Sequence, residues 1–185
     1  PAFGTVNLWP AASAGGRPAA LEQAGMRLDG YLHAAGLAAS EDGDPTRVLR
    51  TLHLLAATLE VPRFAVVTTL GGKLGLERSP TLSRYMPQAA ALGYAKALGR
   101  ERPDRVVRAL DVDPRTDPAK NATWIVEELL GGDATPEVGF TGGERVVPEL
   151  EPVSPRPRTR ALDPDDVVLI TGGAGEIGAQ VAKWA

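Results

Sequence analysis

The residues with the clearest capacity for chemistry form a glycine-rich segment near the end of the sequence. Gly173, Gly175 and Gly178 have the spacing G-x-G-x-x-G. In this pattern the first glycine permits a tight turn, the second lets the backbone approach a pyrophosphate, and the third lets a helix pack closely against a strand. Amide groups at the start of that helix would face the anion. The spacing therefore predicts a phosphate-binding turn for a dinucleotide cofactor.

The predicted site covers the whole turn. Thr171 precedes the glycines and is expected to hydrogen-bond the turn backbone. Glu176 is expected to point outward, because a carboxylate suits a helix N-terminus but would repel a phosphate. We predict cofactor contacts for the consecutive residues Thr171, Gly172, Gly173, Ala174, Gly175, Glu176, Ile177 and Gly178.

Such a turn requires a strand before it and a helix after it. Residues 167–170 are a short apolar run, typical of a parallel strand that is buried on both faces, and residues 179–185 can continue as a helix. One strand and one helix cannot bury this apolar run by themselves. We therefore expect residues 166–185 to begin a second Rossmann unit that belongs to a longer polypeptide.

The preceding residues alternate between strand and helix patterns. Strands are predicted at 5–9, 30–34, 64–69 and 106–113, and helices at 18–28, 44–59, 87–100 and 118–130. Residues 137–150 contain a hairpin signal around Thr141, Gly142 and Gly143. The predicted fold class is α/β: a truncated Rossmann-like parallel sheet flanked by helices, with a β-hairpin near its end. Residues 1–150 form this subdomain, and the segment 151–165, rich in proline and arginine, is a linker.

Composition excludes several classes of function. The 185 residues are 43% hydrophobic and carry a net charge of −3, so nothing in the overall charge favours nucleic acid or a membrane surface as a partner. Cysteine is absent and there are two histidines, which argues against thiolate chemistry and metal sites. The sequence has no long apolar span and no signal-peptide pattern. We expect a cytoplasmic piece of a longer chain.

Residues 165–185, with the turn G-G-A-G-E-I-G, resemble the opening of the ketoreductase domain of a modular type I polyketide synthase. These domains are complex short-chain dehydrogenase/reductases with the cofactor motif GGxGxxG. A structural subdomain and a proline-bearing linker precede the motif in this family, and residues 1–150, including the closing segment 137–150, resemble that arrangement.

The resemblance implies NADPH as cofactor and reduction of a β-ketoacyl group to a β-hydroxyacyl group on an acyl carrier protein. The implied partners are the remaining catalytic subdomain, the carrier protein and neighbouring synthase domains. The choice between NADPH and NADH depends on the charge after the second strand of the cofactor fold, which this sequence does not contain. The catalytic serine, tyrosine and asparagine or lysine of the family would also follow Ala185, so no catalytic residue is predicted in this chain.

The first 150 residues carry an incomplete copy of the family's catalytic motif. Residues 28–36 and 66–75 resemble its fourth and fifth strands, and Thr68 or Thr69 would replace the serine. Both threonines lie farther from Tyr85 than the family spacing, and Ala89 stands where the family has lysine or asparagine. Lys96 lies on another part of the predicted helix, and residues 9–16 lack a phosphate-binding turn. We therefore interpret residues 1–150 as structural and without catalytic activity.

Other residues that could do chemistry have simpler structural interpretations. The pairs His33 and His53, and Asp111 and Asp113, are expected to be satisfied structural or surface groups. Tryptophans 9, 124 and 184 are expected to anchor cores or interfaces, and the arginines at 156, 158 and 160 to belong to a solvated linker.

Two alternatives to a reductase remain. The parent could be a scaffolding module without catalysis, which an incomplete downstream serine, tyrosine and lysine set would indicate. It could also be a free-standing dehydrogenase with a rearranged order of elements, although the missing initiator methionine speaks against this.

Overall fold

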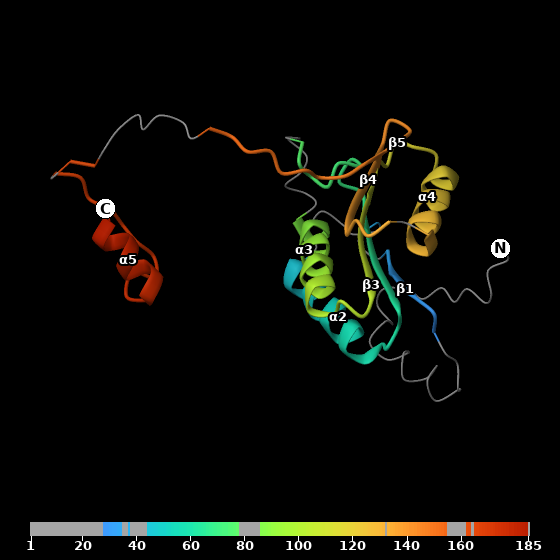
Figure 1. Cartoon of the computed structure of the whole chain (residues 1–185), viewed down its shortest axis with the longest axis horizontal. Coiled ribbons are helices and arrows are strands. Elements are labelled where there is room, and N and C mark those ends of the chain that lie inside the picture. Colours follow the sequence, from blue (N-terminus) through green and yellow to red (C-terminus); the bar gives the residue numbers. More distant parts are fainter. Residues whose placement is uncertain are drawn as a thin grey trace. The chain divides into compact units, whose positions relative to one another are not determined.

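The structure is a computed structural model that describes residues 28–34, 37, 44–77, 86–131, 133–154, 162–163 and 165–184 (Figure 1). The predicted strand at 5–9 and nearly all of the predicted helix at 18–28 lie outside these residues, as do Tyr85, Trp9 and the three linker arginines. The chain divides into two compact units, Pro1–Glu149 and Leu150–Ala185.

The first unit contains a five-stranded sheet with the order β1-β2-β3-β4-β5. Strands β1 to β4 are parallel, and β5 runs antiparallel to β4. The predicted α/β class with a truncated, Rossmann-like sheet is confirmed. The strands are β1 Tyr31–His33, β2 Arg63–Thr68, β3 Val106–Val112, β4 Glu137–Thr141 and β5 Glu144–Val146, and the helices are α2 Pro45–Thr58, α3 Met86–Glu101 and α4 Pro118–Gly131.

Helix α2 begins and ends where its sequence indicates. The side chain of Asp44 accepts a hydrogen bond from the Thr46 N–H at 2.8 Å, and Pro45 occupies the first helical position, where its missing N–H costs nothing. At the other end, the N–H of Leu59 donates to the carbonyl of Leu55 at 2.8 Å. The predicted helix at 44–59 is therefore confirmed at both ends.

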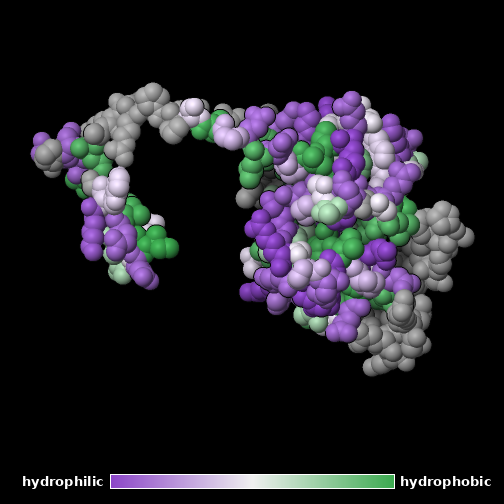
Figure 2. Space-filling model, viewed as in Figure 1, coloured by the Kyte–Doolittle hydropathy of each residue, from purple (hydrophilic) through white to green (hydrophobic). Residues whose placement is uncertain are grey.

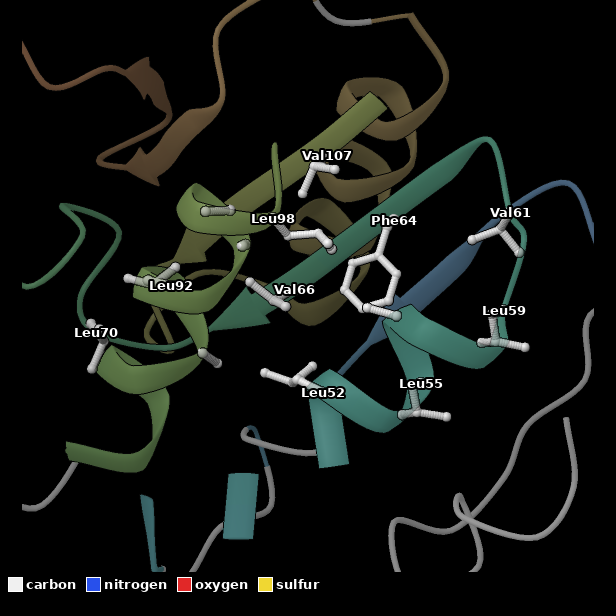
Figure 3. Close-up of a cluster of buried hydrophobic side chains, with 14 residues drawn as sticks. Leu52, Leu55, Leu59, Val61, Phe64, Val66, Leu70, Leu92, Leu98 and Val107 are labelled. Carbon is white, nitrogen blue, oxygen red and sulfur yellow. The ribbon is translucent and has the colours of Figure 1, made fainter. Parts of the chain in front are cut away.

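Both faces of the sheet are covered, which explains why its strands are nearly continuous apolar runs. Helices α2 and α3 lie on one face and α4 lies on the other (Figure 1). Alternate residues of β2 divide between the two cores: Phe64 and Val66 pack with α2 and α3, whereas Ala65 and Val67 belong to the core beside α4. Figure 3 shows the first core, in which Leu52 and Leu55 of α2 belong to the same cluster as Phe64.

The predicted hairpin is confirmed. Strands β4 and β5 pair from Thr141 opposite Glu144, and the two residues between them are Gly142 and Gly143. Their φ angles are +59° and +90°. A two-residue turn with both φ angles positive has the twist that a hairpin requires, and glycine adopts this conformation without steric cost.

The second unit differs from its prediction before the glycine turn. Helix α5 forms over Glu176–Trp184, but residues 167–170 are not a strand, and Val167 and Leu169 are 98% and 91% exposed. A parallel strand exists only through hydrogen bonds to a neighbour, and the sheet pairings in the described part of the chain all lie in the first unit. Hydrophobic side chains consequently lie at the surface of this unit (Figure 2).

Candidate phosphate-binding turn

Three backbone hydrogen bonds shape the glycine turn. The N–H of Gly173 donates to the carbonyl of Ile170 at 3.2 Å, and the N–H of Gly175 donates to the carbonyl of Gly172 at 2.9 Å. The third bond, from the N–H of Ala179 to the carbonyl of Gly175 at 2.8 Å, is the first bond of the helical ladder. The chain therefore passes directly from a tight turn into α5.

The glycines serve different purposes in this turn. Gly172 has a φ of +73°, which makes it the left-handed residue, whereas the prediction gave the tight-turn role to Gly173. A Cβ atom added to Gly178 would lie 2.1 Å from the carbonyl oxygen of Gly172. Gly178, the third glycine of the motif, thus packs closely against the backbone of the turn itself, whereas the expected neighbour was the preceding strand. At Gly175 an added Cβ would lie 3.3 Å from the same oxygen, a much milder contact.

The start of α5 presents backbone donors. Because the helical ladder begins at Ala179, the N–H groups of Glu176, Ile177 and Gly178 precede its first bond. These groups and the helix dipole favour an anion at this end. Gly173 and Gly178 are half-buried, and the other predicted site residues are exposed: Thr171, Gly172, Ala174, Gly175, Glu176 and Ile177.

The threonines at the serine-like position of the first unit have structural partners. Thr68 is fully buried, and its hydroxyl donates to Asp111 Oδ1 at 2.6 Å. Thr69 lies beside Gln88 of α3, whose Oε1 accepts from the Thr69 N–H at 2.6 Å and from its hydroxyl at 3.2 Å. The role of Gln88 could not be predicted from the sequence, because a lone glutamine has no pattern that marks its hydrogen-bond partner.

The position at which the ketoreductases that this sequence resembles have lysine or asparagine holds an alanine, which has no group to donate or accept a proton. Ala89 is an exposed residue of α3. Lys96 lies on the same helix, and its Nζ forms an ion pair with Glu137 at the start of β4, at 3.0 Å. The Lys96 ammonium group therefore links α3 to the sheet.

The buried carboxylates at the end of β3 are structural. Asp111 is fully buried and accepts hydrogen bonds from the loop after β2, from the N–H groups of Leu70 at 2.6 Å and Leu74 at 2.9 Å. Burial raises the pKa of Asp111, and these hydrogen bonds oppose the rise. The Asp113 carboxylate accepts two hydrogen bonds from the Arg115 guanidinium, and these bonds lower the pKa of Asp113. Both carboxylates thus have hydrogen-bond partners within the protein, as expected for structural groups.

The two histidines lie in different settings. His33 is buried, and its Nδ1 lies 3.1 Å from the hydroxyl of Tyr31. Burial lowers the pKa of His33 and raises that of Tyr31 to about 12. His53 is exposed on α2, and its ring meets that of Tyr94 edge to face. Among the described residues there is no group of three metal-ligating side chains.

Of the two tryptophans within the described ranges, one lies beside a core. Trp124 stacks on Phe140 with the ring centres 5.0 Å apart, and the Nζ of Lys120 lies 4.8 Å from the Trp124 ring. Trp184, near the end of α5, is 83% exposed. In the parts of the chain that the structure describes, no helix is long and apolar enough to cross a membrane.

Comparison with known proteins links the chain to polyketide synthesis. No protein-family model matches the sequence. The chain is 34% identical over 97 residues to the spectinabilin polyketide synthase system protein NorA' of Streptomyces orinoci. The match covers 51% of this chain and 2% of the length of that relative. The similarity supports a connection with polyketide synthase systems.

Proposed function

We propose that this chain is part of a polyketide synthase ketoreductase that reduces a carrier-bound β-ketoacyl group with NADPH. Residues 1–150 are the structural subdomain, 151–165 the linker, and 166–185 the beginning of the cofactor-binding subdomain. The proposal agrees with the similarity to a polyketide synthase system protein, which does not itself specify the reaction.

The glycine turn is the observation that carries the proposal. The contact between Gly178 and the backbone of Gly172 leaves no room for any side chain at residue 178. It brings the start of α5 against the turn, with the N–H groups of Glu176 and Ile177 ahead of the first helical bond. A pyrophosphate group fits this arrangement because it needs several backbone donors and a nearby chain without side chains.

Within the proposed reaction, bound NADPH supplies the hydride that reduces the β-carbonyl. The residues of this chain contribute binding and orientation: the amide groups at the start of α5 hold the pyrophosphate, and Gly175 allows it to approach the backbone. The exposed carboxylate of Glu176 would lie away from the phosphates. The acid–base residues of the reaction are expected in the sequence after Ala185.

A structural role for the first unit accounts for its modified motif. Thr68 and Thr69 donate their hydroxyl hydrogens to Asp111 and Gln88, so neither is poised to donate to a substrate carbonyl. Catalysis of this kind needs a donor, a proton source and a lysine or asparagine together. In this proposal the first unit therefore stabilises the catalytic subdomain by packing and takes no part in the chemical step.

The second unit exposes apolar side chains that the rest of the catalytic subdomain would cover. Val167 and Leu169 precede the turn, and Ile177, Val181 and Trp184 are spaced along one face of α5. Burial of these side chains in an extended sheet would also allow residues 167–170 to form the predicted strand. The remaining catalytic subdomain is the first partner that we propose, followed by the acyl carrier protein and neighbouring synthase domains.

NADPH binding tests the proposal. Binding is measured by calorimetry and by tryptophan fluorescence, with Trp184 in the helix that follows the turn, for the 185-residue chain and for the parent polypeptide extended by about one domain length. Binding by the extended protein alone supports the assignment. Binding by the short chain that survives deletion of residues 166–185 would locate a nucleotide site in the first unit and contradict it. No binding by either would favour the scaffolding alternative.

Two glycine variants of the extended protein test the proposed roles. Gly175→Ala adds a Cβ only 3.3 Å from the Gly172 oxygen, so we expect weaker NADPH binding with an almost unchanged melting temperature. Gly178→Ala places its Cβ 2.1 Å from that oxygen and should disturb the turn itself. Gly93→Ala in α3 has no heavy atom within 4 Å of the added Cβ and is the control for both. Equal affinity of Gly175→Ala and wild type would contradict the pyrophosphate assignment.

A further inference from the structure

We propose that the loop Leu70–Leu76, which follows β2, is an anion-binding nest whose site is occupied by the chain's own Asp111 carboxylate. The nest would bind a small free carboxylate such as formate if the Asp111 carboxylate were removed. The inference concerns the first unit and does not depend on the proposed reductase function.

The donors converge on one side chain. Asp111 Oδ1 accepts from the hydroxyl of Thr68 and from the N–H of Leu70, both at 2.6 Å, and Oδ2 accepts from the N–H of Leu74 at 2.9 Å. Burial raises the pKa of Asp111, and a hydrogen bond with the Gly72 backbone is one of those that oppose this rise. Several backbone N–H groups directed at one point form the type of concavity that binds anions.

The backbone of the loop is built for this convergence. Four residues within it have positive φ angles: Gly71 (95°), Gly72 (75°), Leu74 (58°) and Gly75 (71°). A side chain such as that of Leu74 rarely adopts this conformation, and it persists only where the surroundings compensate for the strain. The charge-assisted bond from the Leu74 N–H to Asp111 is one such compensation.

The loop is also held from its outer side. A Cβ added to Gly72 would lie 2.1 Å from the carbonyl oxygen of Phe140 in β4, so the two backbones are in direct contact. The loop therefore has a support that does not involve Asp111. Because that support remains when the carboxylate is removed, the nest should keep its donors in place for another anion of the same shape.

Removal of the carboxylate is the direct test. Thermal unfolding of the 185-residue chain is measured for wild type, Asp111→Gly and Asp104→Gly, in formate and in chloride at the same ionic strength. Asp104 pairs with Arg102 at the surface and its removal leaves no buried space, so it controls for general salt effects. With a dissociation constant of about 10 mM, about 200 mM formate should raise the melting temperature of Asp111→Gly by about 4 °C more than chloride does.

The controls make the outcomes distinct. Asp111→Asn fills the same space, so formate should not stabilise it more than chloride does. An equal effect of formate on Asp111→Gly, Asp104→Gly and wild type would overturn the proposal. If Asp111→Gly does not fold, amide exchange in the wild-type protein decides: slow exchange at Leu70, Gly72 and Leu74 supports the nest, and exchange as fast as in an open loop contradicts it.

Discussion

The contact between Gly139 and Gly72 provides a sensitive test of how β4 supports the loop after β2. A Cβ added to Gly139 would lie 2.1 Å from the carbonyl oxygen of Gly72, 2.9 Å from its carbonyl carbon and 2.9 Å from Cγ2 of Val146. Gly139 pairs with Asp111 in the sheet and has no positive φ angle. The substitution Gly139→Ala therefore changes space alone, without backbone strain at the substituted residue.

The expected cost follows from the size of the overlap. Ordinary van der Waals contact begins at 3.4 Å, so the loop must move by about 1.3 Å, and the obstructing atoms belong to backbone that cannot change rotamer. Overpacking of this kind costs about 1–3 kcal/mol. Movement of Gly72 would also weaken the hydrogen bonds that the neighbouring N–H groups donate to Asp111, each worth about 1.5–3 kcal/mol for a charged acceptor. We expect Gly139→Ala to lower the free energy of unfolding by about 3 kcal/mol.

Urea denaturation measures this cost, with circular dichroism for helix content and tryptophan fluorescence for the region around Trp124. Trp124 stacks on Phe140, the neighbour of Gly139, and therefore reports on this part of the sheet. Gly93→Ala is the matched control, because its added Cβ meets no atom within 4 Å and alanine favours a helix over glycine by about 0.5–1 kcal/mol. If Gly139→Ala unfolds within about 0.5 kcal/mol of wild type, the reasoning from backbone contact is refuted.

Two further perturbations test other buried groups. Burial lowers the pKa of His33 below its ordinary value of 6.5, so the folded state binds fewer protons than the unfolded state and stability should fall as the pH falls below about 6.5. His33→Gln should make the free energy of unfolding depend less on pH, in denaturation measured from pH 7.5 to 5. The slope that one titrating group can cause is at most about 1.4 kcal/mol per pH unit. An unchanged slope in the variant would show that His33 is not the source of the dependence. Glu128, which is buried, accepts two bonds from Arg145 and lies 3.9 Å from Arg108, so Glu128→Ala should cost about 3 kcal/mol in the same assay. Arg145→Met should cost less because the Arg145 side chain is 35% exposed, and the reverse order would contradict this account.

Local patterns were sufficient to predict most of the elements that the structure describes in the first unit. Helix α2 follows from an aspartate, a proline and leucines at helical spacing, and the hairpin from two consecutive glycines. Strands β2 and β3 place apolar residues on both faces because helices cover both, a property visible in the residues themselves. In each case the information lies within about 15 residues of chain, where propensity and periodicity act directly.

The details that differ depend on contacts between distant residues. The run at 167–170 has a strand composition but no strand, because pairing requires a neighbour that composition cannot supply. Gln88 contacts Thr69, and Asp111 contacts the loop that begins at Leu70, across separations of 19 and 41 residues. A single sequence contains no signal for such pairs. The left-handed role of Gly172 rather than Gly173 was missed because adjacent glycines are equally able to adopt it.

Two glycine-rich turns among the described residues present backbone N–H groups, and they differ in whether a group of the protein itself accepts from them. In the loop after β2, the Asp111 carboxylate completes the donors from within the fold and is fully buried. At the start of α5, the N–H groups of Glu176 and Ile177 precede the helical ladder, and both residues are exposed. A filled nest stabilises the structure and has no capacity left for a ligand, whereas an exposed one keeps that capacity. The same backbone chemistry therefore supports a structural role for the first turn and a binding role for the second, consistent with the division of labour that we propose between the two units.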